Sequence, residues 1–181
     1  MKRTLIAVCG LAPQVITETV YALCHQGRRP DRVQVLTTRE GRDACLSQLF
    51  DGDKGAWYQL LKTLGIPADA IDFSPQRIHA VTRQGKEIDD ISDEADNEAF
   101  LRACMHLSWE HSRHPDEAVF YSIAGGRKTM GACLALAVQA YGRPQDRVFH
   151  VLVNSEFENS RTFFFPPAPP VEIELRDRNH E

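Results

Sequence analysis

The sequence predicts a single α/β domain over residues 1–181, built on a parallel sheet with helices against it. Short apolar segments that suit buried strands, such as residues 4–9, recur along the chain. Between them lie longer segments in which apolar residues recur every three or four positions, as in amphipathic helices. Strands that alternate with helices in this way are typical of parallel sheets. The length suits one domain with a sizeable core.

The first half of the chain contains two predicted strands, at residues 4–9 and 32–38. Pro13 suits the first position of a helix, where its missing N–H is not needed, and Gly65 is a stop signal. The predicted helices lie at about residues 13–26, 42–50 and 57–64.

The second half continues the alternation and ends in a predicted hairpin. The expected elements are a peripheral strand at residues 78–81, a helix at 93–112, a strand at 118–121, a helix at about 127–141 and a buried strand at 147–153. Residues 161–165 and 171–175 are predicted to form a β-hairpin at the edge of the sheet, joined by the proline-rich residues 166–170.

The turn after the strand at 118–121 carries the strongest functional signal. Gly125 and Gly126 let backbone N–H groups approach a ligand, and the following helix offers unpaired N–H donors at its start. Arg127 and Lys128 lie in the first helical turn, where the helix dipole disfavours cations unless an anion is near. The turn therefore predicts a phosphate site, and the neighbouring Ser122 and Thr129 join it as candidate ligand contacts.

Two other interpretations of this turn are open. It can be a tight connection whose Arg127 and Lys128 point into water. Alternatively, Lys128 and Thr129 imitate the end of a Walker A loop, but that motif needs glycine directly before the lysine, where this chain has Arg127. A P-loop nucleotide hydrolase is therefore disfavoured.

The turn after the first strand is the second candidate region. Gly10 and Pro13 lie in the turn itself, and Gln14, Thr17 and Glu18 share one polar face of the following helix. In a parallel sheet this turn lies at the carboxyl edge, where ligands bind. We expect these residues, with Thr37 at the end of the second strand, to line the crevice; the alternative for the polar helix face is simple solvation.

Composition limits the classes of ligand and location. A net charge of −4 and a pI near 6.0 argue against a broad grip on long nucleic acid, but allow a small polyanion in a local basic pocket. No apolar run approaches the roughly 20 residues that span a bilayer. Gly10 and Pro13 interrupt the N-terminal apolar run too early for a signal peptide. No membrane association is expected, and the protein is predicted to be cytoplasmic.

No metal or cofactor is expected. The cysteines lack CxxC spacing and are predicted to be buried free thiols: Cys9, Cys24, Cys45, Cys104 and Cys133. His106, His111 and His114 are expected on a helix surface rather than at a metal. The acidic residues 87–96 suggest magnesium, but acids at a helix start are already explained by the dipole.

The two turns together resemble those of CARF proteins (CRISPR-associated Rossmann fold) of type III CRISPR systems. The matching residues are Gly10, Pro13, Gln14, Val15, Ile16, Thr17 and Glu18 in the first motif, and Ser122, Gly125, Gly126, Arg127, Lys128, Thr129 and Met130 in the second. The ending at residues 163–167 is also similar to that of short CARF proteins. The resemblance covers essentially the whole chain and implies a Rossmann-like sheet.

The resemblance further implies a homodimer that binds a cyclic oligoadenylate, most often the tetra-adenylate, across its twofold axis. The residues agree with a dimer, because the helix at 131–141 is apolar around its whole circumference and needs cover on every side. A second subunit is the predicted cover; the alternative is the C-terminal segment of the same chain.

Two roles are open for a stand-alone CARF domain. As a ring nuclease it opens the messenger without a metal, by attack of a ribose 2′-hydroxyl on the adjacent phosphate. Lys128 and Arg127 would then stabilise the phosphate charge, while Thr17 or Glu18 orients or deprotonates the hydroxyl. Several ring nucleases have serine or threonine directly after the first strand, where this chain has Cys9. The other role is a non-catalytic sensor or regulatory subunit. A small-nucleotide enzyme of the dinucleotide-binding type is disfavoured, since no GxGxxG follows the first strand.

Overall fold

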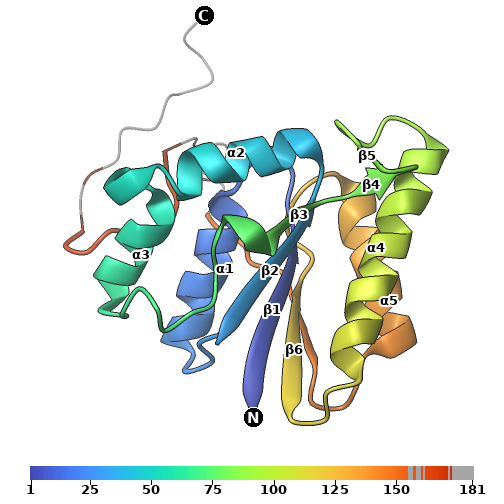
Figure 1. Ribbon diagram of the computed structural model, residues 1–181. Coiled ribbons are helices and arrows are strands. Elements are labelled where there is room, and N and C mark those ends of the chain that lie inside the picture. The colour runs from blue at the N-terminus through green and yellow to red at the C-terminus, as the bar shows by residue number, and fades with distance from the viewer. Residues whose placement is uncertain (155–156, 158–159, 161, 171, 173–181) are drawn as a thin grey trace, which may run out of the picture.

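The computed structural model describes residues 1–154, 157, 160, 162–170 and 172. Its centre is a five-stranded sheet in the order β3-β2-β1-β6-β7, in which every pair is parallel (Figure 1). The strands are β1 (Lys2–Val8), β2 (Arg32–Thr37), β3 (Ile78–Ala80), β6 (Glu117–Ser122) and β7 (Arg147–Phe149). The predicted α/β fold is confirmed, and β3 lies at one edge as expected.

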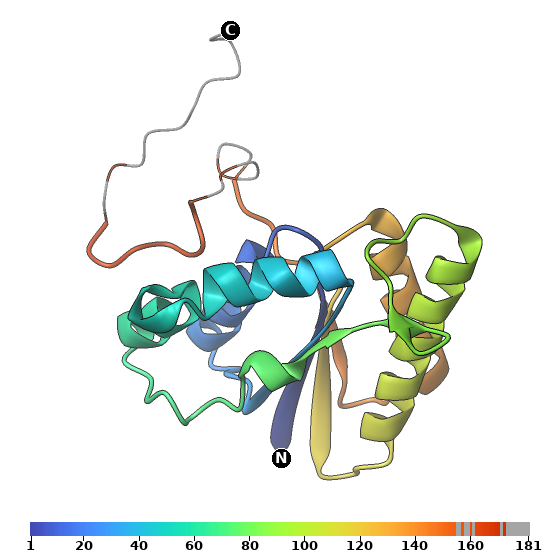
Figure 2. The same cartoon turned by 45° about the horizontal axis from the view of Figure 1, so that its top comes forward.

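Helices cover both faces of the sheet (Figure 2). One face carries α1 (Gln14–His25), α2 (Arg39–Leu49) and α3 (Ala56–Leu64), and the other carries α4 (Glu94–Ser112) and α5 (Lys128–Tyr141). Leu5 in the central strand β1 and Cys9 directly after it join the first hydrophobic cluster, whereas Ile6 and Val8 of β1 join the second. Successive side chains of a strand point to opposite faces, so a continuously apolar strand needs cover on both sides.

The order of the strands reverses beside β1. The chain passes from β1 to β2 and β3 on one side, and later returns to β6 and β7 on the other. The connections that follow β1 and β6 therefore diverge to opposite faces of the sheet. In open parallel sheets, ligands bind in the crevice at such a switch point, at the carboxyl ends of the strands.

A short hairpin joins the sheet to α4. Its strands β4 (Thr82–Arg83) and β5 (Lys86–Glu87) pair antiparallel, and residues 88–91, here called the anchored segment, follow. Ile88 and Ile91 at its two ends are only 6% and 9% exposed and belong to the core on the α4–α5 face. Single 3₁₀ turns at Gly52–Lys54 and Pro75–Arg77 complete the described elements.

The C-terminal part of the fold differs from the prediction. β7 ends at Phe149 rather than near residue 153, and it is largely exposed, because an edge strand has a neighbour on one side only. Residues 162–165 do not form a hairpin strand; Phe164 and Phe165 instead pack against the core on the α1 face. The second predicted strand, at 171–175, lies outside the described residues except for Glu172, which is not in a strand.

His111 is buried, contrary to its expected place on the surface of α4. Its Nδ1 lies 2.7 Å from Glu117 Oε2, and its Nε2 lies 2.6 Å from Gln34 Nε2. The hydroxyl of Thr4 donates to the other carboxylate oxygen of Glu117. Because its polar atoms are hydrogen-bonded in this way, His111 can be buried. The network connects α4 to the beginnings of β1 and β6, at the end of the sheet opposite the crevice.

All five cysteines of the chain lie within the described residues. All five cysteines are free thiols and four of them are buried, as predicted. Over the described residues, no group of three His, Cys, Asp or Glu side chains is arranged to hold a metal ion. Within the same ranges, no helix has the length and apolar character needed to cross a membrane.

Candidate functional site

Two glycines bring the loops after β1 and β6 into direct backbone contact. A Cβ on Gly10 would lie 2.9 Å from the Cα of Gly126, a separation that real Cβ atoms essentially never show. A Cβ on Gly126 would lie 3.2 Å from the backbone nitrogen of Gly10. The two motifs singled out in the sequence therefore lie side by side at the switch point and form the floor of the crevice.

The conformation of the second loop depends on glycine at both positions. Gly126 has a φ of +74°, in the left-handed region that favours glycine. A Cβ on Gly125 would lie 2.2 Å from the carbonyl oxygen of Val8 in β1. Gly125 is buried against this strand and Gly126 is exposed. The loop consequently presents the backbone of Gly126 to a ligand.

The start of α5, like that of α1, lacks the side-chain cap that α2 and α4 have. Its N-cap residue, Arg127, makes no side-chain capping bond. At α2, the Thr38 side chain accepts from the backbone N–H of Gly41, and the Asp93 side chain caps α4 in the same manner. Uncapped N–H groups and the positive end of the dipole suit an anion. Of these three helices, α5 is therefore the one prepared for a phosphate.

Arg127 has a partner that the sequence analysis did not foresee. Its Nε donates to Asp90 Oδ1 at 2.9 Å, and its Nη2 donates to Asp90 Oδ2. The expected anion beside Arg127 was a phosphate, whereas the structure supplies a carboxylate because the anchored segment returns to the start of α5. The hydrogen bonds from Arg127 lower the pKa of Asp90, so this carboxyl is ionised at neutral pH.

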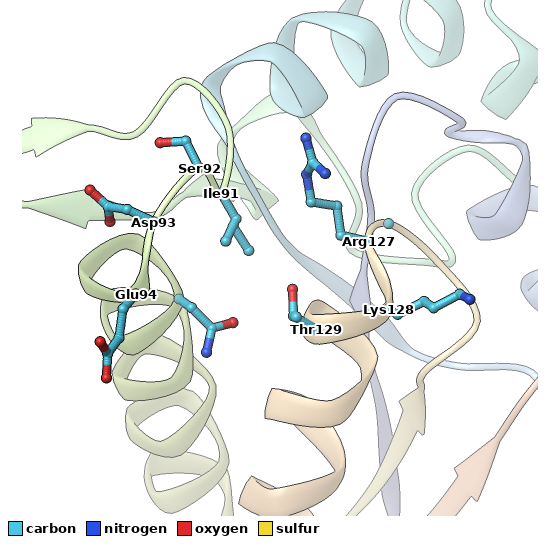
Figure 3. Close-up of a pocket in the computed structure, with 9 residues that line it drawn as sticks. Ile91, Ser92, Asp93, Glu94, Arg127, Lys128 and Thr129 are labelled. Carbon is cyan, nitrogen blue, oxygen red and sulfur yellow. The ribbon is translucent and has the colours of Figure 1, made fainter.

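Lys128 and Thr129 are exposed in the first turn of α5. Figure 3 shows the Lys128 side chain extending in a different direction from those of Arg127 and Thr129. Lys128 thus adds a cation beside the uncapped helix start without sharing the carboxylate that binds Arg127.

A cavity of about 720 Å³ opens between the starts of α4 and α5 (Figure 3). Its wall on the α5 side includes the glycine loop and the first helical turn, and its wall on the α4 side includes Ile91, Asn97 and the acidic residues Asp93 and Glu94. Cavities of this size accept small organic ligands. The cationic turn therefore borders a space large enough for a nucleotide.

Thr17 does not reach the crevice. Its hydroxyl is fully buried, 2.8 Å from the carbonyl oxygen of Gln14 and 2.7 Å from that of Phe164. The ring of Phe165 stacks on Tyr21 one turn further along α1, with centroids 6.4 Å apart. The polar face of α1 was expected to open to a ligand, but at Thr17 and Tyr21 the C-terminal segment covers it. Thr17 holds that segment, and its predicted catalytic role is corrected accordingly.

Two further hydroxyl residues of the prediction are also internal. The Thr37 hydroxyl donates to the carbonyl oxygen of Cys9 at 2.6 Å, and Ser122 lies 3.2 Å from Thr19 between their hydroxyl oxygens. Both residues are at most 1% exposed. They stabilise the strand ends from inside, because the last residues of central strands remain under the helices.

Glu18 and the remaining residues of the first motif have different environments. Pro13 and Gln14 are buried, and Gly10 is half-buried. Burial raises the pKa of Glu18 from 4.5 to about 7. A carboxyl with such a pKa can exchange a proton near neutral pH, which is the property required of a general acid or base.

Asp90 is the site residue that the sequence analysis missed. The acidic stretch 87–96 suggested only magnesium or a helix start, and the second explanation is correct for Asp93. Asp90 lies 37 positions from Arg127 in the sequence. No local spacing in the sequence reveals such a pair. The weak signal for it is an arginine without a nearby acidic residue in one loop, Arg127, and several acidic residues in another, at 87–96.

The fold and the paired glycine loops define a CARF-type protein, a Rossmann-like domain with its crevice at the carboxyl edge. The chain belongs to the family described as CRISPR-associated protein NE0113, whose model matches residues 12–181. The recognition of a CARF-type CRISPR protein from its two motifs is thereby confirmed.

Solved structures give the same fold at low sequence identity. Csm6 of Enterococcus italicus, bound to cyclic hexa-2′-fluoro-hexa-dAMP, matches 84% of this chain with a TM-score of 0.51 and 18% identity. The match covers 34% of the Csm6 chain, so this chain spans about a third of that protein. A putative UDP-N-acetylglucosamine 2-epimerase of Listeria monocytogenes is similar over 83% of this chain and 31% of the epimerase chain, at 18% identity and with a TM-score of 0.40. No curated protein matches the sequence.

Proposed function

We propose that this protein binds a cyclic oligoadenylate, most favourably the tetra-adenylate, across a homodimer and cleaves it as a metal-independent ring nuclease. The observation that carries the proposal is the uncapped start of α5, where exposed Gly126 backbone and Lys128 lie at the switch point of the sheet. Membership of a CRISPR-associated family and the cyclic oligonucleotide bound to Csm6 support this choice among polyanions.

A ring of phosphates suits two copies of this site. Each subunit would contribute one helix start, one Lys128 and one Arg127, and charge-assisted hydrogen bonds to phosphate are about twice as strong as neutral ones. The adjoining cavity of about 720 Å³ gives the attached nucleosides room. A small cyclic ligand also agrees with the net charge of −4, which does not suit long nucleic acid.

The exposed face of α5 supports the homodimer. One side of the helix is in the core, while the residues on its other side are exposed: Ala132, Ala135, Leu136 and Ala140. Leu136 is 54% exposed, and Val148 of β7, which pairs with Tyr121 of the core on this face, is 48% exposed. Phe164 and Phe165 pack on the opposite face of the sheet and therefore do not cover α5. A second copy would bury this apolar surface.

Cleavage would use the ribose 2′-hydroxyl of the ligand. Its oxygen bonds to the adjacent phosphorus while the P–O5′ bond breaks and the released 5′ oxygen takes up a proton from water, which leaves a 2′,3′-cyclic phosphate and a 5′-hydroxyl. Lys128, Arg127 and the Gly126 N–H would stabilise the charge on the phosphate. Glu18, with a pKa of about 7, is our candidate to accept the proton of the 2′-hydroxyl.

The second candidate is a sensor that binds the messenger without cleaving it. It is favoured by the burial of Thr17, Thr37 and Ser122, which removes three hydroxyl groups that were expected to contact the ligand. Such a protein would act through a partner or through a further domain, in line with the share of Csm6 that this chain matches.

One experiment separates these candidates. Purified protein is incubated with cyclic tri-, tetra- or hexa-adenylate in EDTA, and both bound ligand and linear products are measured. Products that end in a 2′,3′-cyclic phosphate support the ring nuclease and identify its ring size. Tight binding of intact rings supports the sensor, and the absence of any binding would contradict the proposal.

A further inference from the structure

We propose that Asp90 is a positioning residue that holds Arg127 ready for a phosphate of the ligand, an inference that rests on the proposed function. Arginine at a phosphate site works best when its planar group is oriented before the ligand arrives. The pair between Asp90 and Arg127 supplies this orientation from outside the glycine motif.

The geometry of the pair leaves Arg127 able to bind a second anion. Asp90 accepts from Nε and from Nη2, which form one edge of the guanidinium group. Of the five N–H donors of an arginine, two are used in this way and three remain. The Arg127 side chain is still 57% exposed, so the free donors face solvent and not the protein interior.

Asp90 is itself held by the main chain. The backbone N–H groups of Arg39 and Glu40 donate to the carbonyl oxygens of Ile88 and Asp89, at 2.9 and 3.3 Å. Asp90 Oδ1 also accepts from the N–H of Ile91 at 2.8 Å. With Ile88 and Ile91 buried, the anchored segment belongs to the scaffold, and its carboxylate is a fixed support and not a group waiting to be displaced.

Asp89 provides a matched control within the same segment. It carries the same charge one residue earlier, but its side chain pairs with Arg39 of α2 and not with Arg127. Removing either carboxylate raises the net charge equally, whereas only removal of Asp90 releases Arg127. A general electrostatic effect and a positioning effect therefore predict different results for the two positions.

The test compares the affinity for cyclic tetra-adenylate of the wild type with that of Asp90→Ala, Asp89→Ala, Arg127→Ala and the Asp90→Ala/Arg127→Ala double variant. The cost of ordering a long side chain predicts that Asp90→Ala binds more weakly by a factor of about 2 to 12 for each subunit that contacts the ring. Asp89→Ala should bind at least as tightly as the wild type. In the Arg127→Ala background, loss of Asp90 should have no further effect. Equal or tighter binding by Asp90→Ala, or equal losses at positions 89 and 90, would overturn the inference.

A ligand-free measurement separates this inference from the proposed function. In the NMR spectrum, the Arg127 Nε–H should give a slowly exchanging signal in the wild type and in Asp89→Ala, and lose it in Asp90→Ala. A signal that persists in Asp90→Ala contradicts positioning, whatever the ligand. Failure of the wild type to bind any cyclic oligoadenylate contradicts the proposed function, and with it the ligand-directed role of Asp90, even where the NMR result shows the pair.

Discussion

Gly10 and Gly126 touch so closely that a Cβ on Gly10 would lie 2.9 Å from the Gly126 Cα. This contact sets how near the loops after β1 and β6 approach each other at the crevice. The backbone fixes the position of a Cβ on residue 10, and the Gly126 Cα is itself a backbone atom. Rotation of a side chain therefore cannot relieve the contact made by a larger residue at position 10.

Gly10→Ala should therefore shift the glycine loop and destabilise the fold. Overpacking of this kind costs about 1–3 kcal/mol, which urea unfolding will measure. Leu11→Ala is the control in the same loop, since Leu11 is 66% exposed and its truncation should cost under about 0.5 kcal/mol. Equal stability of the wild type and Gly10→Ala would show that the loops can separate freely.

Lys128→Ala should weaken binding of the messenger. A charge-assisted hydrogen bond contributes about 1.5–3 kcal/mol per subunit, which corresponds to a factor of about 10 to 150 in affinity for each of the two subunits that hold the ring. Calorimetric titration with cyclic tetra-adenylate measures the effect, and Lys62→Ala, an exposed lysine of α3, controls for the loss of charge. Unchanged affinity in Lys128→Ala would mean that the uncapped start of α5 is not the phosphate site.

Glu18 should give cleavage a pH dependence. With a pKa of about 7, the base form grows as the pH rises through 7, so the single-turnover rate should rise there and then level off. Glu18→Gln should lower the rate by about 10²- to 10⁴-fold and abolish the rise. A normal pH profile in Glu18→Gln would exclude Glu18 as the base.

The same residue makes a prediction for stability. Its folded pKa is raised above 4.5, so the contribution of Glu18 to stability is fully present below about pH 4.5 and is lost as the pH rises through 7. The melting temperature of the wild type should therefore decline over this window relative to Glu18→Gln. Parallel curves for the two proteins would show that the carboxyl is solvated.

The buried network at the other end of the sheet has the opposite dependence. Burial opposes ionisation of Glu117, but hydrogen bonds from His111 and Thr4 outweigh it and lower its pKa to about 2. Its contribution is present above about pH 4.5 and is lost as the pH falls toward 2. Glu117→Gln should unfold more easily at pH 7, by about 3–5 kcal/mol in urea, and show less acid sensitivity than the wild type.

Leu136→Asp should dissociate the proposed dimer without unfolding the subunit. The side chain is 54% exposed in the single chain, so the change costs little there, but a carboxylate in an apolar interface is unfavourable. Light scattering should give the mass of one subunit, and messenger binding should fall. Tyr58→Asp, on α3 at the opposite face, is the control and should leave the mass unchanged. A monomeric wild type would contradict the dimer.

Much of the fold could be predicted because it depends on local patterns. The continuously apolar segment around Ile6 requires cover on both sides, and Gly65, with a φ of +64°, ends α3 as expected. β7 and the C-terminal segment were mispredicted because apolar residues alone do not tell which surface will receive them. Phe164 and Phe165 bury against α1 and not in a sheet.

The candidate site, too, could be predicted from the sequence only in part. From the sequence alone came the glycine turn, the cations at the start of its helix and the place of the first turn at the carboxyl edge, because these follow from the backbone freedom of glycine, the helix dipole and the geometry of parallel strands. Only the tertiary structure decided that Asp90 holds Arg127, that Thr17 lies under Phe164 and that burial raises the pKa of Glu18. Each of these depends on which distant segments become neighbours, and that is a property of packing which no spacing along the chain contains.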